Sequence, residues 1–305
     1  MQTPKNIGIV GGGLMGAGIA QVFAVAGHHV TVFDTDEATR SSLQKRVEDN
    51  LTSIDADPGP AKSIMVVAHM EEAVGQADFV TEAVSEVLSL KRKIFTELVK
   101  LSPANAVLAS NTSVIPITKI AEGITTPERI VGTHWWNPPY LVPLVEVVQA
   151  ENTSNETIEF TMRLLASVGK SPAHVKKDLP GFIANRLQHA LWREAIAMVA
   201  EGVCDAKTLD NCVKNSFGLR LPVLGPLENA DMVGLDLTLD IHKTIMPELA
   251  RYDRPHDFLE QKVSDGKLGF KNGEGFRGWT ETEMNELKSL VAKHLINIQK
   301  KGVKE

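Results

Sequence analysis

A glycine-rich run between a short apolar segment and a helix-like segment limits the fold of this chain more than any other feature. The run reads Gly11-Gly-Gly13-Leu14-Met15-Gly16. Gly11 allows a tight turn, Gly13 lets a ligand approach the backbone, and Gly16 lets the helix pack closely on the strand. The free N–H groups at the helix start, at Leu14 and Met15, would face the phosphates of such a ligand. The sequence therefore predicts a dinucleotide-binding domain of the Rossmann type.

An acidic residue follows the second apolar segment, Val30–Phe33. Asp34 lies about 20 residues beyond the glycine run, where a carboxylate accepts hydrogen bonds from the ribose hydroxyls of adenosine. A 2′-phosphate would meet this negative charge, and the next residues, Thr35 and Asp36, offer no cation to offset the repulsion. We therefore expect NAD rather than NADP as the cofactor. The alternative is a glycine-rich turn in which Asp34 only caps a helix.

Strand-length apolar runs alternate with helical segments through the first half of the chain. Predicted helices include Met15–Ala26 and Leu90–Leu101. This alternation predicts a mostly parallel sheet with helices wound on both of its faces, and so an α/β Rossmann domain. The predicted strands are Ile7–Val10, Val30–Phe33, Met65–Ala68, Phe79–Val80, Val107–Ala109 and Ile130–Gly132.

The pattern changes beyond Lys177, where no convincing strand follows. Apolar residues recur at helical spacing from Ile183 to Val199, and a last helix is expected near Thr282–Gln299. The second half of the chain is therefore predicted to be all-helical. Helices such as Phe182–Glu201 carry more apolar residues than one small domain covers, so a homodimer is expected.

The boundary between the two patterns is expected at Pro180 and Gly181. Proline cannot continue a strand ladder, and glycine permits a sharp turn before the first long helix. We expect an NAD-binding Rossmann domain over residues 1–180 and a helical domain for substrate binding and dimerisation over residues 181–305.

Composition and charge exclude several classes of partner. Hydrophobic residues make up 43% and charged residues 23% of the chain, as in ordinary globular proteins. The net charge of −6 and the scattered Lys and Arg residues disfavour nucleic acid as a partner. No apolar run approaches the roughly 18 residues of a membrane span, and Ile7 begins a strand before a signal peptide could fit. Cys204 and Cys212 are expected to be reduced thiols without a metal site, so a cytoplasmic location is predicted.

His134 differs from the other histidines because it lies just beyond the apolar strand Ile130–Gly132. Ligands bind at this carboxyl edge in open α/β sheets. Oxidation of an alcohol needs a base for the hydroxyl proton while a hydride leaves, and histidine suits that role at neutral pH. Glu146 could accept the other ring N–H and stabilise the imidazolium. A buried Glu at this position could equally cap a helix, and the sequence leaves both interpretations open.

Further runs resemble the L-3-hydroxyacyl-CoA dehydrogenase family over almost the whole chain. The resemblance implies the Rossmann fold, the helical second domain, a dimer and NAD-linked oxidation of a hydroxyl group. The matching runs are the glycine run, Ser110–Ser113, Gly132–Pro138, Pro143–Glu146, Pro180–Arg186, Gly225–Pro226 with Asp231–Asp236, and Lys267–Phe276.

The same resemblance implies roles for individual residues. His134 would be the catalytic base and Glu146 its orienting partner. Ser113 and Asn185 would donate hydrogen bonds near the substrate oxygens.

Two more residues, Glu86 and Lys91, match family positions near the ribose and nicotinamide half of the cofactor. Asn111 is also expected to bind the cofactor. Spacing alone would instead favour Glu86 as a helix cap and Lys91 as a solvated lysine on a helix face.

Two departures from the acyl-CoA pattern bear on the substrate. Between the second and third strands, acyl-CoA members have a longer, lysine-rich helical hairpin that contacts the CoA nucleotide. The corresponding segment here, residues 37–64, is short, and its positive and negative charges nearly balance. Arg220 stands where acyl-CoA members commonly have uncharged residues, and its guanidinium would suit a free carboxylate. The alternative for Arg220 is a helix terminus or a dimer interface. Residues 137–146 also resemble branches acting on small free acids, including L-gulonate 3-dehydrogenase, L-carnitine dehydrogenase and a pyridine-carboxylate dehydrogenase.

The sequence thus predicts an NAD-dependent dehydrogenase that oxidises a hydroxyl group. The expected substrate is a small hydroxy acid, oxidised at C3, and the alternative substrate is a 3-hydroxyacyl-CoA thioester. A competing class is a crystallin-like structural or NAD-sensing protein without turnover. The set Ser113, His134, Glu146 and Asn185 argues against that class, since a pure binder needs no base.

Overall fold

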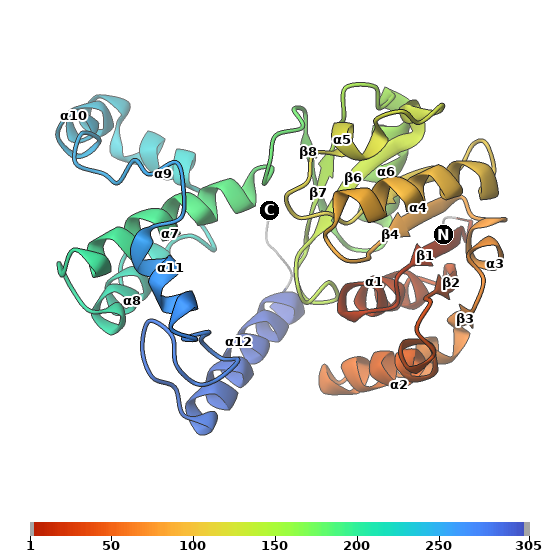
Figure 1. Cartoon of the computed structure of the whole chain (residues 1–305), viewed down its shortest axis with the longest axis horizontal. Coiled ribbons are helices and arrows are strands. Elements are labelled where there is room, and N and C mark those ends of the chain that lie inside the picture. Colours follow the sequence, from red (N-terminus) through yellow and green to blue (C-terminus); the bar gives the residue numbers. More distant parts are fainter. Residues whose placement is uncertain (1–2, 302–305) are drawn as a thin grey trace. The chain divides into compact units, whose positions relative to one another are not determined.

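The computed structural model describes residues 3–301, which form an eight-stranded sheet followed by a series of helices (Figure 1). The chain divides after Arg186 into two compact units. Of the described residues, one unit contains 3–186 together with 294–301, and the other is Leu187–Lys293.

The first unit alternates strands and helices, as the sequence predicts. Its elements in chain order are β1 (Asn6–Val10), α1 (Leu14–Val25), β2 (His29–Phe33), α2 (Glu37–Ser53), the 3-10 helix η1 (Gly59–Ser63), β3 (Met65–Val67), α3 (Met70–Val74), β4 (Phe79–Glu82), α4 (Leu88–Leu101), β5 (Val107–Ser110), α5 (Ile117–Ala121), η2 (Pro127–Arg129), β6 (Ile130–Trp135), β7 (Leu144–Val148), α6 (Asn155–Ser167) and β8 (Ser171–Val175).

The strands pair in the order β3-β2-β1-β4-β5-β6-β7-β8. Every pair is parallel except β6 with β7, which run antiparallel. After β3 the chain crosses to β4, which pairs with the other side of β1, and ligands of such sheets bind at the switch point between β1 and β4. The Rossmann fold and the six predicted strands are confirmed, whereas β7 and β8 were not predicted.

Two hydrophobic cores cover the two faces of the sheet. Adjacent residues of β1 contribute to different cores, Ile9 to one and Val10 to the other, because successive strand side chains point to opposite faces. The first core includes Phe23 of α1, and the second includes Phe95 of α4. The sheet is therefore wound on both faces and holds the carboxyl ends of its strands in fixed register.

The second unit contains no strand among its described elements and has only isolated bridges near Glu274. This confirms the all-helical prediction. Its elements are α7 (Ala184–Ala200), which starts in the first unit, α8 (Ala206–Lys214), η3 (Phe217–Leu219), α9 (Pro226–Val233), α10 (Leu235–Ile245), α11 (Asp257–Ser264) and α12 (Glu281–Lys301). Within residues 3–301, none of the helices combines the length and hydropathy of a membrane span.

Candidate active site

The glycine run forms the turn from β1 into α1. Gly11 has a φ of +101°, and a Cβ there would lie 2.8 Å from the Ala83 carbonyl oxygen. A Cβ on Gly16 would lie 1.8 Å from the Gly11 oxygen, so only glycine allows this close approach of helix and turn. At Gly13, by contrast, a Cβ would meet no heavy atom within 4 Å among its described neighbours. The turn is therefore tight at both ends and open in the middle.

The start of α1 has free donors toward this open space. Gly13 is the N-cap residue and makes no side-chain cap, and the first intrahelical bond runs from Ala17 N–H to Gly13 O. The N–H groups of the first turn, at Leu14, Met15 and Gly16, precede that bond and have no intrahelical acceptor. Leu14 is also 70% exposed. Uncapped amides beside open space fit the pyrophosphate of NAD.

Asp34 follows β2, and backbone donors hold both of its carboxylate oxygens. Gly12 N–H donates to Oδ2 at 2.7 Å, and Asp36 N–H donates to Oδ1 at 2.9 Å. The carboxylate is thus fixed beside the glycine turn, where the ribose hydroxyls of adenosine would be expected.

Two arginines of α2 contact this region, and the sequence pattern predicted neither contact. Arg40 Nη1 donates to the carbonyl oxygens of Asp34 and Thr35 at 2.8 and 2.9 Å. Arg46 Nη2 donates to the Gly12 oxygen at 2.7 Å. The residues directly after Asp34 include no cation, but the early turns of α2 carry these two side chains back to the end of β2.

His134 and Glu146 are cross-strand neighbours. The strand β6 runs beyond its predicted end and includes His134, which lies directly opposite Glu146 on antiparallel β7. Nδ1 of His134 lies 2.8 Å from Oε2 of Glu146, and both residues are buried, with 4% and 1% of their surface exposed. An ionised Glu146 holds the proton on Nδ1, which leaves Nε2 of His134 as the basic nitrogen.

The second oxygen of Glu146 holds the start of α7. Oε1 accepts hydrogen bonds from the N–H groups of Ile183 and Ala184 at 2.8 and 3.1 Å. Glu146 therefore contacts His134 with one carboxylate oxygen and caps the start of α7 with the other. Burial alone would raise the pKa of Glu146, but the bonds from His134, Ala184 and Ile183 bring it below its usual value.

Two aromatic rings flank the imidazole of His134. The ring centroids of Trp136 and Phe182 lie 5.3 and 5.6 Å from that of His134. Phe182 is 2% exposed and has a φ of +52°, directly after Gly181 with a φ of +76°. A left-handed conformation at a phenylalanine costs about 1–3 kcal/mol and commonly marks a functional site. This turn aims the Phe182 ring at His134.

Lys170 supports the loop that follows His134. Its Nζ donates to the carbonyl oxygen of Pro139 and, at 3.1 Å, to that of Val142. The same amine lies 5.6 Å from the Trp135 ring centroid. Burial lowers the pKa of Lys170 to about 8.

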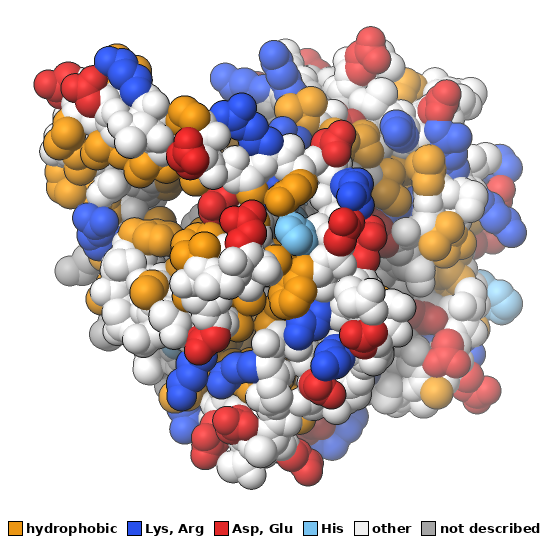
Figure 2. All heavy atoms as spheres, turned by 60° about the vertical axis from the view of Figure 1, so that its left-hand side comes forward, with side chains coloured by type: hydrophobic (Ala, Val, Ile, Leu, Met, Phe, Trp, Pro, Cys, Tyr) orange, Lys and Arg blue, Asp and Glu red, His pale blue; other side chains and the backbone are white. Residues whose placement is uncertain are grey.

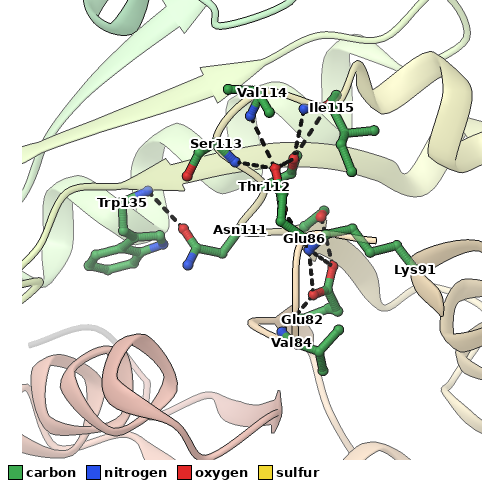
Figure 3. A network of polar contacts seen from close by, with 11 residues as sticks. Glu82, Val84, Glu86, Lys91, Asn111, Thr112, Ser113, Val114, Ile115 and Trp135 are labelled. Carbon is green, nitrogen blue, oxygen red and sulfur yellow. Dashed lines mark hydrogen bonds and ion pairs between the residues drawn. The ribbon is translucent and has the colours of Figure 1, made fainter. Parts of the chain in front are cut away.

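Glu86 organises the loop that carries Ser113 (Figure 3). Its Oε1 accepts hydrogen bonds from the Thr112 hydroxyl and from the N–H groups of Ser113 and Val114, the latter two at 2.9 and 3.1 Å. Burial would raise the pKa of Glu86, but the Thr112 bond, the charge of Lys91 and the two N–H donors lower it. Glu86 is not the N-cap of α4, which is Val87, so the helix-cap interpretation is wrong.

Lys91 lies inside the protein between two carboxylates. Its Nζ lies 2.7 and 3.0 Å from the oxygens of Glu82 and 3.4 Å from Oε2 of Glu86. The side chain is fully buried, so the interpretation of a solvated helix-face lysine is wrong. Ser110 Oγ also donates to Glu82 at 2.7 Å. The ends of β4 and β5 and the start of α4 are thereby joined in one network.

Asn111 and Ser113 follow the end of β5, and Asn185 contacts the same loop. Asn111 Oδ1 accepts a hydrogen bond from Trp135 N–H at 3.0 Å, which ties the end of β5 to the end of β6 (Figure 3). Asn185 Nδ2 donates to the Ser113 carbonyl oxygen at 3.0 Å. Ser113 is exposed and Asn185 is partly exposed, so both are accessible to a ligand.

Arg220 lies in the second unit, where it ends the short helix η3. Its side chain is exposed, and it makes none of the ion pairs found among residues 3–301. In the described part of the chain, no group of three or more His, Cys, Asp or Glu side chains could hold a metal ion.

Sequence profiles match both halves of the chain. The profile described as 3-hydroxyacyl-CoA dehydrogenase, NAD binding domain, matches residues 6–179. The profile described as 3-hydroxyacyl-CoA dehydrogenase, C-terminal domain, matches residues 181–279.

Individual relatives and structures agree with these profiles. A 5-formyl-3-hydroxy-2-methylpyridine 4-carboxylate 5-dehydrogenase from Mesorhizobium japonicum is 34% identical over 301 residues, covering 97% of each chain. A crystal structure of an enzyme of that name, described as an NAD+-dependent dismutase, gives a TM-score of 0.89 at 34% identity, covering 97% of this chain and 98% of its own. The structure of (S)-3-hydroxybutyryl-CoA dehydrogenase from Ralstonia eutropha gives a TM-score of 0.76 at 33% identity, and the match covers 92% of this chain and 100% of that enzyme.

Proposed function

Since the chain belongs to the 3-hydroxyacyl-CoA dehydrogenase family, we propose that it oxidises the hydroxyl group of a small free hydroxy acid through His134 and Glu146. It is an NAD-dependent dehydrogenase acting on CH–OH groups. The observation that carries the catalytic assignment is the buried contact of 2.8 Å between His134 Nδ1 and Glu146 Oε2.

The proposed mechanism uses residues of the first unit. Nε2 of His134 takes the hydroxyl proton, and Glu146 stabilises the imidazolium that forms. Ser113 and Asn185 donate hydrogen bonds to the substrate oxygens. NAD, when bound, supplies the acceptor for the hydride. His134 and Glu146 are buried, so the bond between them acts in a medium of low dielectric.

Three observations support a free acid over a CoA thioester. Between β2 and β3 the chain has a single helix, α2, and a short 3-10 turn rather than a lysine-rich hairpin. The TM-score is 0.89 with a pyridine-carboxylate enzyme and 0.76 with an acyl-CoA enzyme. Arg220 has a guanidinium that none of the described ion pairs neutralises. A carboxylate would pair with this cation, whereas a thioester would not.

A turnover assay tests this proposal. The enzyme with NAD is given a panel of small 3-hydroxy acids and hydroxymethyl aromatic acids, with 3-hydroxybutyryl-CoA in parallel. We expect turnover of a free acid, and Arg220→Met should raise its KM by about 10- to 100-fold, with a smaller change in kcat. Arg251→Met, which removes another exposed arginine of the helical unit, serves as the matched control.

The other outcomes separate the competing proposals. Turnover of the CoA ester alone, with no effect of Arg220→Met, would place the chain among the acyl-CoA enzymes. Tight NADH binding without turnover of any substrate would favour the structural or NAD-sensing class.

We also propose a homodimer formed through the helical unit, with the domain division at residue 180. In the described part of Leu187–Lys293, Ala197 is the single buried hydrophobic residue, and α8, α9, α10 and α11 contain no buried residue. Large apolar side chains are exposed instead, including Leu227 at 80% and Leu235 at 63%. Figure 2 shows that apolar side chains gather on the face of the molecule that it draws. Surfaces of this kind are normally covered by a partner. The cytoplasmic location stays a prediction.

A further inference from the structure

The turn between β2 and α2 holds the cation of Arg40 against the backbone of the segment that carries Asp34. Asp36 caps α2 by accepting the Thr39 N–H at 2.7 Å, so the helix begins immediately after the strand. This start brings Arg40, in the first turn of α2, back to the strand end, where Nη1 donates to the carbonyl oxygens of Asp34 and Thr35. The guanidinium is therefore anchored to the same short segment that carries the Asp34 carboxylate.

Arg40 forms no ion pair with any of the described residues. Within residues 3–301, neither Asp34 nor another carboxylate lies within 4.0 Å of its guanidinium nitrogens. Both of its hydrogen bonds use Nη1, and a guanidinium has five N–H donors in a planar fork. Donors thus remain for an anion placed near the end of β2.

Backbone hydrogen bonds hold the Asp34 carboxylate in place. Gly12 N–H and Asp36 N–H hold its two oxygens at 2.7 and 2.9 Å. An anion near Arg40 would therefore lie beside a fixed carboxylate, and the repulsion would offset the attraction of the arginine.

We propose that Arg40 is a latent ligand for the 2′-phosphate of NADP, and that the Asp34 carboxylate alone keeps this site selective for NAD. The proposal rests on the ribose-binding role proposed for Asp34. Arg40 is favoured over Arg46 as the ligand. Arg46 Nη2 already donates to the oxygens of Gly12 and Thr39, and its Nε donates to the Ser42 hydroxyl.

Four proteins test the proposal: the wild type, Asp34→Ser, Arg40→Met and the double variant. The Kd values of NADH and NADPH are measured by nicotinamide fluorescence, and 2′,5′-ADP and 5′-ADP are used as competitors. In Asp34→Ser we expect the Kd of NADPH to fall at least about tenfold and that of NADH to rise. In the double variant the Kd of NADPH should be about 10- to 100-fold higher than in Asp34→Ser, which is the range of one charge-assisted contact. Its NADH Kd should match that of Asp34→Ser.

Controls separate a local charge effect from a general one. Lys45→Met in the Asp34→Ser background removes a cation from the same helix whose Nζ pairs with Asp49, and it should leave the Kd of NADPH unchanged. High salt should weaken NADPH binding to Asp34→Ser more than to the double variant. If Arg40→Met fails to fold, Arg40→Gln replaces it.

Equal NADPH affinities in Asp34→Ser and the double variant would overturn the proposal. So would an Asp34→Ser variant that keeps the NAD preference of the wild type. A wild type that binds NADH but turns over no substrate would contradict the proposed function while leaving this inference intact.

Discussion

The position of one proton decides what His134 can do. Glu146 contacts Nδ1, and the bonds that lower the pKa of Glu146 keep it ionised at neutral pH. An ionised partner favours the tautomer that carries its proton on Nδ1, so Nε2 has a free lone pair. In the neutral imidazole, Nε2 is therefore the nitrogen that can take a proton from the substrate.

Replacing either member of the pair should separate their contributions. His134→Gln removes the base and should lower kcat by about 10²–10⁴-fold, while Glu146→Gln should cost less because the imidazole remains. NADH affinity, measured by fluorescence, should stay close to that of the wild type in His134→Gln. Wild-type turnover in His134→Gln would contradict the assignment of the base.

Lys170 should make stability depend on pH. Its pKa is about 8 in the folded protein and about 10.4 in an unfolded chain, so between these values the unfolded state binds more protons. The free energy of unfolding should therefore rise with pH from about 8 to 10, relative to Lys170→Met, and the advantage should be lost as pH falls below 8. Urea denaturation at several pH values measures this, with exposed Lys177→Met as the control. Parallel pH curves for the wild type and Lys170→Met would contradict it.

At the scale of elements, the turn before α7 serves both the helix and the histidine. Gly181 and Phe182 take left-handed conformations, and the next two N–H groups bind Glu146. The strain at Phe182 places its ring against His134. The same few residues therefore orient the base from two sides.

Shortening Phe182 should impair catalysis more than cofactor binding. Phe182→Ala should lower kcat about tenfold or more, because the imidazole loses a packing partner that fixes its orientation. Phe182→Leu should recover part of the loss, and the NADH Kd should change little in both. The control is Ile183→Ala, whose side chain is 48% exposed and whose N–H remains. An unchanged kcat in Phe182→Ala would refute this positioning role.

Sequence patterns predicted the strands of the first half because each of those strands is a buried apolar run. They missed β7 and β8 for different reasons. In β7, the charged Glu146 interrupts the apolar run. A strand that buries a carboxylate opposite a histidine therefore lacks the continuous apolar pattern by which the other strands were predicted. In β8, Pro172 argues against a strand, but β8 lies at the sheet edge, where proline is tolerated.

The candidate site was predicted residue by residue but not in its geometry. His134 and Glu146 were paired from their chemistry, whereas their contact depends on the antiparallel register of an unpredicted strand. Arg40 was missed because its approach to Asp34 depends on where α2 begins. Spacing alone also suggested a solvated Lys91, because the spacing does not show that the carboxylates of Glu82 and Glu86 surround its amine. The roles of these residues stay predictions.

At the scale of the whole molecule, the two units differ in how they bury apolar surface. The first has a core on each face of its sheet, whereas helices α8 to α11 of the second have no buried residue. A unit of this size without a core gains little from folding alone. Its stability should therefore depend on association.

Light scattering at micromolar concentration should return twice the chain mass of 33.2 kDa. Leu227→Glu and Leu239→Glu, whose side chains are 80% and 57% exposed, should shift the protein toward the monomer and lower its Tm. Met65→Glu, at an exposed position of the first unit, is the control and should keep the dimer. A monomer mass for the wild type would rule out this assembly.

The shared carboxylate of Glu146 also restricts which residues can begin α7. Proline is normally favoured in the first turn of a helix, because the N–H it lacks has no partner there. At Ile183 and Ala184 those N–H groups do have a partner, Oε1 of Glu146, whose other oxygen contacts His134. A proline at Ala184, the first residue of α7, would suit the helix and still remove a bond to Glu146. At Ile183 a proline would also follow the left-handed Phe182, a conformation that proline disfavours in the residue before it. With Glu146 in its proposed role, catalysis rather than helix formation excludes proline from the first residue of α7.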